Sequence, residues 1–121
     1  MPEHDRVRVA VASEHGAMVV SPYVLAELDY LITERAGVAA ELSALSELRS
    51  GVWEHAQLAA DDIRAARNVI SQYHDQEIGL TDASLVVLAA RYRTNRILTL
   101  DHRHFQVLRT LDGDPFLLLP E

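Results

Sequence analysis

The stretch TDASLVVLAARYRTNRILTLD, residues 81–101, gives the strongest indication of the fold. Its apolar residues first recur at helical spacing, and a short basic turn then leads to the apolar segment RILTL. We expect Thr81 to cap the helix, Asp82 to lie in its first turn, and Asp101 to follow the strand directly. A helix followed by a short apolar strand is typical of a parallel α/β sheet.

The rest of the chain repeats this alternation. Predicted strands cover residues 17–20, 51–56, 96–100 and 114–120, and predicted helices cover 22–35, 38–49, a segment from about 60, and 81 to about 93, with a weak helical pattern over 5–15. Ser21 is the expected N-cap before Pro22, and Gly37 separates two helices. Folds of this class place their sites at the carboxyl ends of strands.

Composition narrows the class of protein. A chain of 121 residues with 49% hydrophobic residues is expected to be a single domain with a core, and no apolar run approaches a membrane span. Without cysteine there is no disulfide or thiolate metal site, and the charged start has no export signal, which favours the cytoplasm. The net charge of −7 argues against nonspecific nucleic-acid binding but is compatible with a nuclease whose acids hold cations.

Three acids lie at unusual positions. Glu27 has apolar neighbours one helical turn away on both sides, Asp82 shares its helix face with apolar residues, and Asp101 ends a strand. Each has an ordinary alternative explanation. Glu27 could pair with an arginine such as Arg35, Asp82 could stabilise a helix N-terminus by ~0.3–1 kcal/mol, and Asp101 could cap the turn that follows.

Taken together, the three acids indicate one site. Carboxylates that converge at a sheet edge repel one another unless a cation lies among them. Without cysteine, such a cluster suits hard cations such as Mg²⁺ or Mn²⁺. A site of this kind can activate water against a phosphodiester.

The segments VVSPYVLAELDYLI, IGLTDASLVVLAARYRTNRILTLDHRHF and FLLLP resemble the PIN domain, and more narrowly the VapC-type toxins of toxin–antitoxin modules. The resemblance implies a three-layer α/β fold with a parallel sheet flanked by helices. It also implies the toxin component of a type II toxin–antitoxin module, a Mg²⁺-dependent endoribonuclease that cuts structured RNA such as tRNA or ribosomal RNA. A homodimer and a VapB-type antitoxin are the implied partners.

The family site has four acids. The resemblance matches the second to Glu27, the third to Asp82 and the fourth to Asp101, with Thr99 as the small hydroxyl residue that often precedes the fourth. The first acid and its strand, which is central in the family sheet, have no counterpart. We therefore expect residues 1–121 to be a single PIN-like domain that is incomplete at its N-terminus.

Basic and imidazole groups surround the predicted turn near Asp101. The arginines are candidates for RNA phosphate contacts, or alternatively belong to a solvated helix end; they are Arg91, Arg93, Arg96 and Arg103. His102 and His104 could form a metal pair, but two residues in one tight turn are a poor ligand set without a further partner.

Two other functions compete with the nuclease. The missing first acid is compatible with a catalytically dead module that only binds an antitoxin or another partner. A response-regulator-like receiver also carries an acid cluster on an α/β fold, but it needs a late lysine, and this chain contains no lysine.

Overall fold

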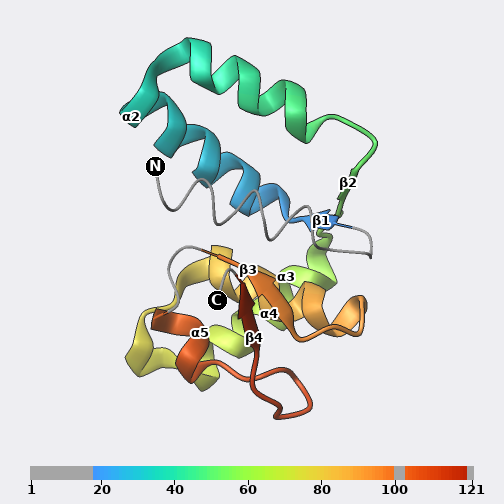
Figure 1. Ribbon diagram of the computed structural model, residues 1–121. Coiled ribbons are helices and arrows are strands. Elements are labelled where there is room, and N and C mark those ends of the chain that lie inside the picture. Colours follow the sequence, from blue (N-terminus) through green and yellow to red (C-terminus); the bar gives the residue numbers. More distant parts are fainter. Residues whose placement is uncertain (1–17, 100–102, 120–121) are drawn as a thin grey trace. The chain divides into compact units, whose positions relative to one another are not determined.

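A computed structural model describes residues 18–99 and 103–119, which belong to two compact units, one within residues 16–58 and the other within residues 59–121 (Figure 1). The weak helical pattern over residues 5–15, Asp101 and His102 lie outside the described residues. The expectation of a single domain over the whole chain stays a prediction.

The first unit begins with a strand and a capped helix. Strand β1 (Met18–Val20) leads to helix α2 (Pro22–Leu48), and β2 (Trp53–His55) pairs with β1 in parallel. The Ser21 hydroxyl accepts a hydrogen bond from the Tyr23 N–H at 3.2 Å, and Pro22 occupies the first helical position. The predicted cap and both strands are thus confirmed.

Helix α2 consists of two arms that meet at Gly37, as the sequence predicts (Figure 1). Gly37 has φ 86° and ψ 178°, a conformation that side chains disfavour. Asp29 in the first arm lies against Glu41 in the second, and their carboxyl groups share a hydrogen bond. This bond to Asp29 raises the pKa of the Glu41 carboxyl above its ordinary value, since two close carboxylates disfavour double ionisation.

The second unit holds the remaining elements: α3 (Ala60–Gln72), the 3₁₀ turn η1 (His74–Gln76), α4 (Gly79–Arg91), β3 (Arg96–Leu98), α5 (Arg103–Val107) and β4 (Leu117–Leu119). Strands β3 and β4 pair in parallel, so the predicted parallel pairing holds in both units. Among the described residues the strands form two separate sheets of two strands each.

The predicted N-cap of α4 was wrong by three residues, because the N-cap is Ile78. The helix begins at Gly79, so Thr81 lies inside its first turn and is not the N-cap. Gly79 has φ 75°, and this glycine-favoured conformation lets the chain enter the helix earlier. The backbone carbonyl of Thr81 accepts a hydrogen bond from the Ser84 hydroxyl at 2.6 Å.

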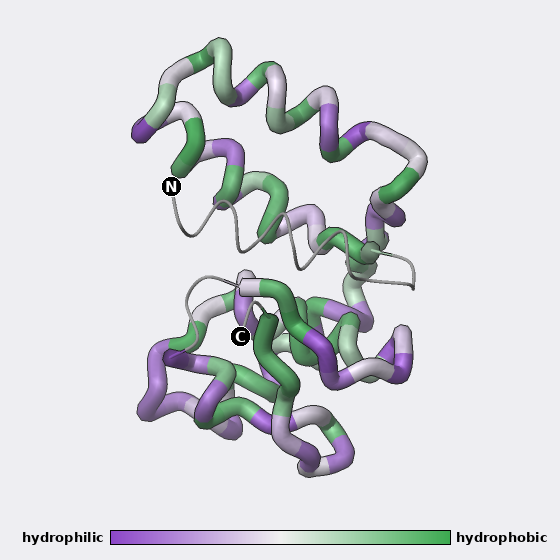
Figure 2. The backbone as a smooth tube through the Cα atoms, viewed as in Figure 1, coloured by the Kyte–Doolittle hydropathy of each residue, from purple (hydrophilic) through white to green (hydrophobic). Residues whose placement is uncertain are grey.

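The apolar core of the second unit lies around α4. Its buried members are Ala66, Val69, Ile78, Ala83, Val86, Val87, Ala89, Ile97, Phe105, Leu108 and Phe116. The rings of Phe105 and Phe116 meet edge to face, with centroids 5.6 Å apart. Figure 2 shows β4 as a continuously hydrophobic stretch, as expected of a strand that borders this core. In the described part of the chain, no helix is both long and apolar enough to cross a membrane.

Replacing Glu41 with Gln should stabilise the hairpin of α2. A carboxyl whose pKa is raised by folding stabilises the fold below its ordinary pKa, and this contribution is lost as the pH rises through the folded pKa. An amide donates to Asp29 without adding charge, so the variant should have a higher Tm than the wild type at neutral pH, and the difference should shrink in acid. Thermal unfolding across pH measures this, with Glu47→Gln in the same arm as control. An equal gain from both substitutions would contradict the pairing.

Candidate active site

Asp82 lies in the first turn of α4, as the sequence predicts. The residues that follow it, Ala83 and Ser84, are almost completely buried, and Val86 is only 1% exposed. This part of the helix is therefore fixed by the core. The Asp82 side chain itself remains 24% exposed. The carboxylate is thus held near a helix N-terminus, where a negative charge is favourable, while it stays accessible from solvent.

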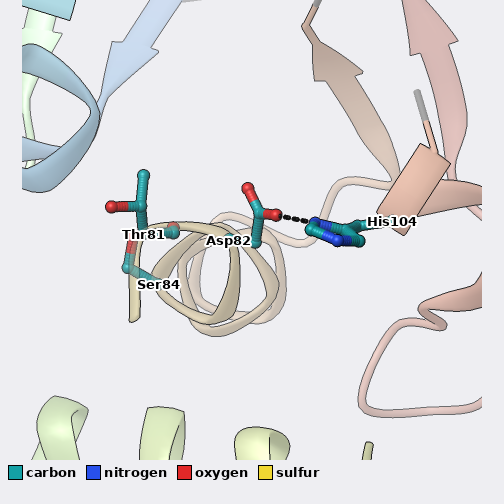
Figure 3. A network of polar contacts seen from close by, with 4 residues as sticks. All are labelled: Thr81, Asp82, Ser84 and His104. Atoms are coloured by element: carbon teal, nitrogen blue, oxygen red, sulfur yellow. Dashed lines mark hydrogen bonds and ion pairs between the residues drawn. The ribbon is translucent and has the colours of Figure 1, made fainter. Parts of the chain in front are cut away.

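His104 is the partner of this carboxylate. Its Nδ1 atom lies 2.6 Å from Asp82 Oδ2, and Figure 3 shows the two side chains pointing toward one another from α5 and α4. An ionised carboxylate only accepts hydrogen bonds, so Nδ1 carries the proton and donates it. Sequence reasoning missed this contact, because it weighed His104 only as a metal partner of His102. The two partners are 22 positions apart, and spacing along the chain gives no signal of their contact.

The core explains why His104 reaches Asp82. Phe105, the next residue, is 2% exposed and packs against Phe116, and Leu108 is fully buried. The Leu108 N–H also donates to the His104 carbonyl at 2.9 Å. Helix α5 is short, but these contacts attach it to the same apolar cluster as α4. The position of the imidazole is therefore set by packing.

Glu27 lies in α2, in the first unit, where its side chain is exposed. The sequence pattern placed it within an apolar stripe, but Tyr30 from that stripe is itself 65% exposed. The expected conflict between a charged group and a buried apolar face therefore does not arise. An exposed carboxylate remains available to a cation or to solvent.

The other predicted ligands are only partly described. Thr99 is half-buried, and its N–H donates to the Leu119 carbonyl at 2.8 Å, which extends the pairing of β3 and β4 up to the residue predicted to support Asp101. Asp101 itself is outside the described residues. Among the side chains that are described, no three histidines or acids form a metal site. The set of Glu27, Asp82 and Asp101 stays a prediction.

The four candidate arginines differ in their surroundings. Arg91, in the last turn of α4, forms an ion pair with Asp62 in the first turn of α3. This pair supports a structural role for Arg91. Arg93, Arg96 and Arg103 are exposed, and Arg93 has a left-handed backbone with φ 52°. Arg91 is exposed as well, so all four arginines stay candidates for phosphate contacts.

Two contacts hold Asp62 in its charged form. The guanidinium of Arg91, and then the Ala59 N–H at 2.8 Å, keep the pKa of the Asp62 carboxyl below its ordinary value. The same carboxylate thus satisfies a free N–H at the start of α3 and joins α3 to α4. This connection holds the end of α4 opposite to Asp82.

Comparison with known proteins identifies close similarities. The family model described as "PIN domain" matches residues 1–110. The chain is 51% identical over 119 residues to a protein named Ribonuclease VapC26 from Mycobacterium tuberculosis (strain ATCC 25618 / H37Rv), covering 98% of this chain and 88% of that relative. The crystal structure of Mycobacterium tuberculosis VapC20, described as a sarcin-ricin loop cleaving toxin, matches with a TM-score of 0.76 at 20% identity, covering 84% of this chain and 78% of that one. The structural match shows the same fold.

Replacing Asp62 with Asn should lower the Tm at neutral pH. A depressed carboxyl pKa means that the stabilisation is present above the ordinary pKa of the group and is lost as the pH falls through the folded pKa. The difference between variant and wild type should therefore disappear in acid, well below about pH 4. Thermal unfolding measured against pH tests this.

The matched control is Asp61→Asn. Asp61 is in the same helical turn, and its pair with Arg64 is 3.6 Å long and highly exposed, so it should contribute little. If Asp61→Asn lowered the Tm as much as Asp62→Asn, the pairing of Asp62 with Arg91 would not contribute specifically to stability.

Proposed function

The chain belongs to the PIN domain family, and on this premise we propose that it is a VapC-type toxin, the ribonuclease of a type II toxin–antitoxin module, which cuts structured RNA such as tRNA or ribosomal RNA. The match of the family model over most of the chain and the extended similarity to a named ribonuclease support the family and the class of reaction. The fold shared with a solved VapC toxin agrees with both.

The position of Asp82 carries the proposal. A carboxylate that is 24% exposed, on a helix turn that the core holds in place, is suited to bind a cation or a substrate. The sequence resemblance assigns the third family acid to this same residue.

The VapC-type ribonucleases of this family generally depend on a divalent metal, and we propose Mg²⁺, with Mn²⁺ as a substitute. The side chains that would hold it are Asp82, Asp101 and Glu27, with Thr99 in support. The donor set fits, because hard cations prefer carboxylate oxygens, and the described acids Asp82 and Glu27 are both accessible from solvent. When bound, the cation would neutralise phosphate charge and make water more acidic.

The chain's own residues would bind and orient the RNA. The four exposed arginines near this turn are suited to phosphate oxygens, since a guanidinium donates two hydrogen bonds in parallel; they are Arg91, Arg93, Arg96 and Arg103. They compensate locally for the net charge of −7, which would otherwise repel RNA. The negative net charge of this protein does not attract nucleic acid nonspecifically. The shape of the RNA would therefore decide which substrates bind.

A VapB antitoxin is the partner that the VapC class generally implies. We propose that this chain binds one, that it forms a homodimer, and that it acts in the cytoplasm, where tRNA and ribosomal RNA are found. An antitoxin that blocks the carboxylates would inhibit cleavage directly. A purified pair should therefore show stoichiometric inhibition of the ribonuclease.

Replacing Asp82 with Asn should abolish RNA cleavage, with a loss larger than the about 10–100-fold that removal of a supporting residue around a metal typically causes. The substitution removes the charge and preserves the size of the side chain. Cleavage of total RNA in the presence of Mg²⁺ measures it, with Asp114→Asn as an exposed control of the same chemistry. Cleavage at the wild-type rate by Asp82→Asn would overturn the assignment.

Removing divalent metal should stop cleavage reversibly. Dialysis against EDTA removes the cation on which the proposed site depends, and either Mg²⁺ or Mn²⁺ should restore the rate. A titration of each metal into the stripped protein, followed by RNA cleavage, gives the concentration for half-maximal rate. Full activity in EDTA would exclude the proposed chemistry.

A further inference from the structure

We propose that His104 is a positioning residue for Asp82: its Nδ1–H holds Oδ2, so that the second oxygen, Oδ1, is presented to a divalent cation. This inference rests on the proposed function, because it deepens the role of Asp82 in the same site. The sequence suggested His104 only as a metal partner of His102, and not as a partner of Asp82. It is carried by the 2.6 Å contact between the two side chains.

The contact is directional. An aspartate in a first helical turn can turn back and accept from the free N–H groups of its own helix. Figure 3 shows that the Asp82 side chain instead points toward His104, away from Thr81. The imidazole thus competes with local hydrogen bonding and fixes the orientation of the carboxylate. His104 binds one oxygen, Oδ2, and no contact of the other oxygen with a described residue is seen, so a ligand can take it.

The contact is also pre-formed. The neighbour of His104, Phe105, is held in the core, and Leu108 closes the following turn. On the other side, Asp82 is followed by fully buried residues of α4. Both side chains are already held in place by anchored helices, so little further conformational entropy is lost when a cation binds. Supporting partners of this kind typically affect metal affinity by about 10–100-fold.

The burial of the pair argues against a purely structural role. His104 and Asp82 are 34% and 24% exposed, so water could satisfy either group if the other were absent. Their bond is therefore of limited value to folding, and its removal should leave the core intact. The consequence of its removal should instead be seen in ligand binding.

The test measures cation binding to the metal-stripped protein without RNA. Isothermal titration of Mn²⁺ at about pH 8, where a free imidazole is neutral, is compared for wild type, His104→Asn and His104→Leu. The Asn amide nitrogen can occupy the place of Nδ1 and donate to Asp82, whereas Leu has no donor. We expect wild-type affinity in His104→Asn and about 10–100-fold weaker binding in His104→Leu. Gln106→Leu, on an exposed position of α5, is the control for surface change.

RNA cleavage gives the second readout. If His104 only positions Asp82, His104→Leu should need a higher Mn²⁺ concentration for half-maximal cleavage, and its rate should recover at saturating Mn²⁺. A rate that stays low at saturating Mn²⁺ while affinity is unchanged would mean that His104 transfers a proton, and would overturn the positioning role. Unchanged or tighter Mn²⁺ binding by His104→Leu would also overturn it.

The two proposals fail in distinguishable ways. A wild type that binds Mn²⁺ with the expected order of variants but cuts no RNA would refute the ribonuclease and leave the positioning role intact. A wild type that cuts RNA, with His104→Leu binding Mn²⁺ as wild type does, would refute only the positioning role. A wild type that binds no Mn²⁺ would refute the metal site and the role of His104 together. Circular dichroism and the Tm of each variant confirm that it is folded.

Discussion

The packing of helix α4 into the apolar core is the constraint on which the candidate site depends. Its middle turns supply Ala83, Val86 and Leu88 to the buried interior, so the helix has little freedom to rotate or slide. Asp82 immediately precedes the first of these residues, and its direction is therefore determined by their burial. The same core holds Phe105, and through it the partner of Asp82. One hydrophobic cluster thus fixes both halves of a polar contact.

Polar groups at the two ends of α4 serve different purposes. At its last turn, Arg91 pairs with Asp62, which also accepts a hydrogen bond from the start of α3. Both charges suit the dipoles of their helices, and the pair joins α3 to α4. At its first turn, Asp82 is also favoured by the dipole, but its partner is a histidine from a short separate helix. The two carboxylates thus receive different partners although their positions in their helices are similar.

Local chemistry explains what the sequence could predict. The cap at Ser21, the proline after it and the break at Gly37 each depend on a few neighbouring residues, and each is confirmed. The early start of α4 depended on the conformation of Gly79, which the pattern did not reveal. The contact of Asp82 with His104 depends on tertiary packing through Phe105, so no local rule could have found it. The surface position of Glu27 likewise follows from the fold of α2 and cannot be read from helical periodicity alone.

The identity of each partner follows from what its carboxylate must do. Arginine is permanently charged, and beside Asp62 it keeps the carboxyl ionised as a lasting structural contact. A guanidinium beside Asp82 would repel a divalent cation from the oxygen that the cation needs. An imidazole can donate the same hydrogen bond whether or not it is charged. A neutral imidazole can therefore orient a carboxylate without neutralising its charge. A histidine at position 104 is therefore compatible with a cation on Asp82 in a way that an arginine would not be.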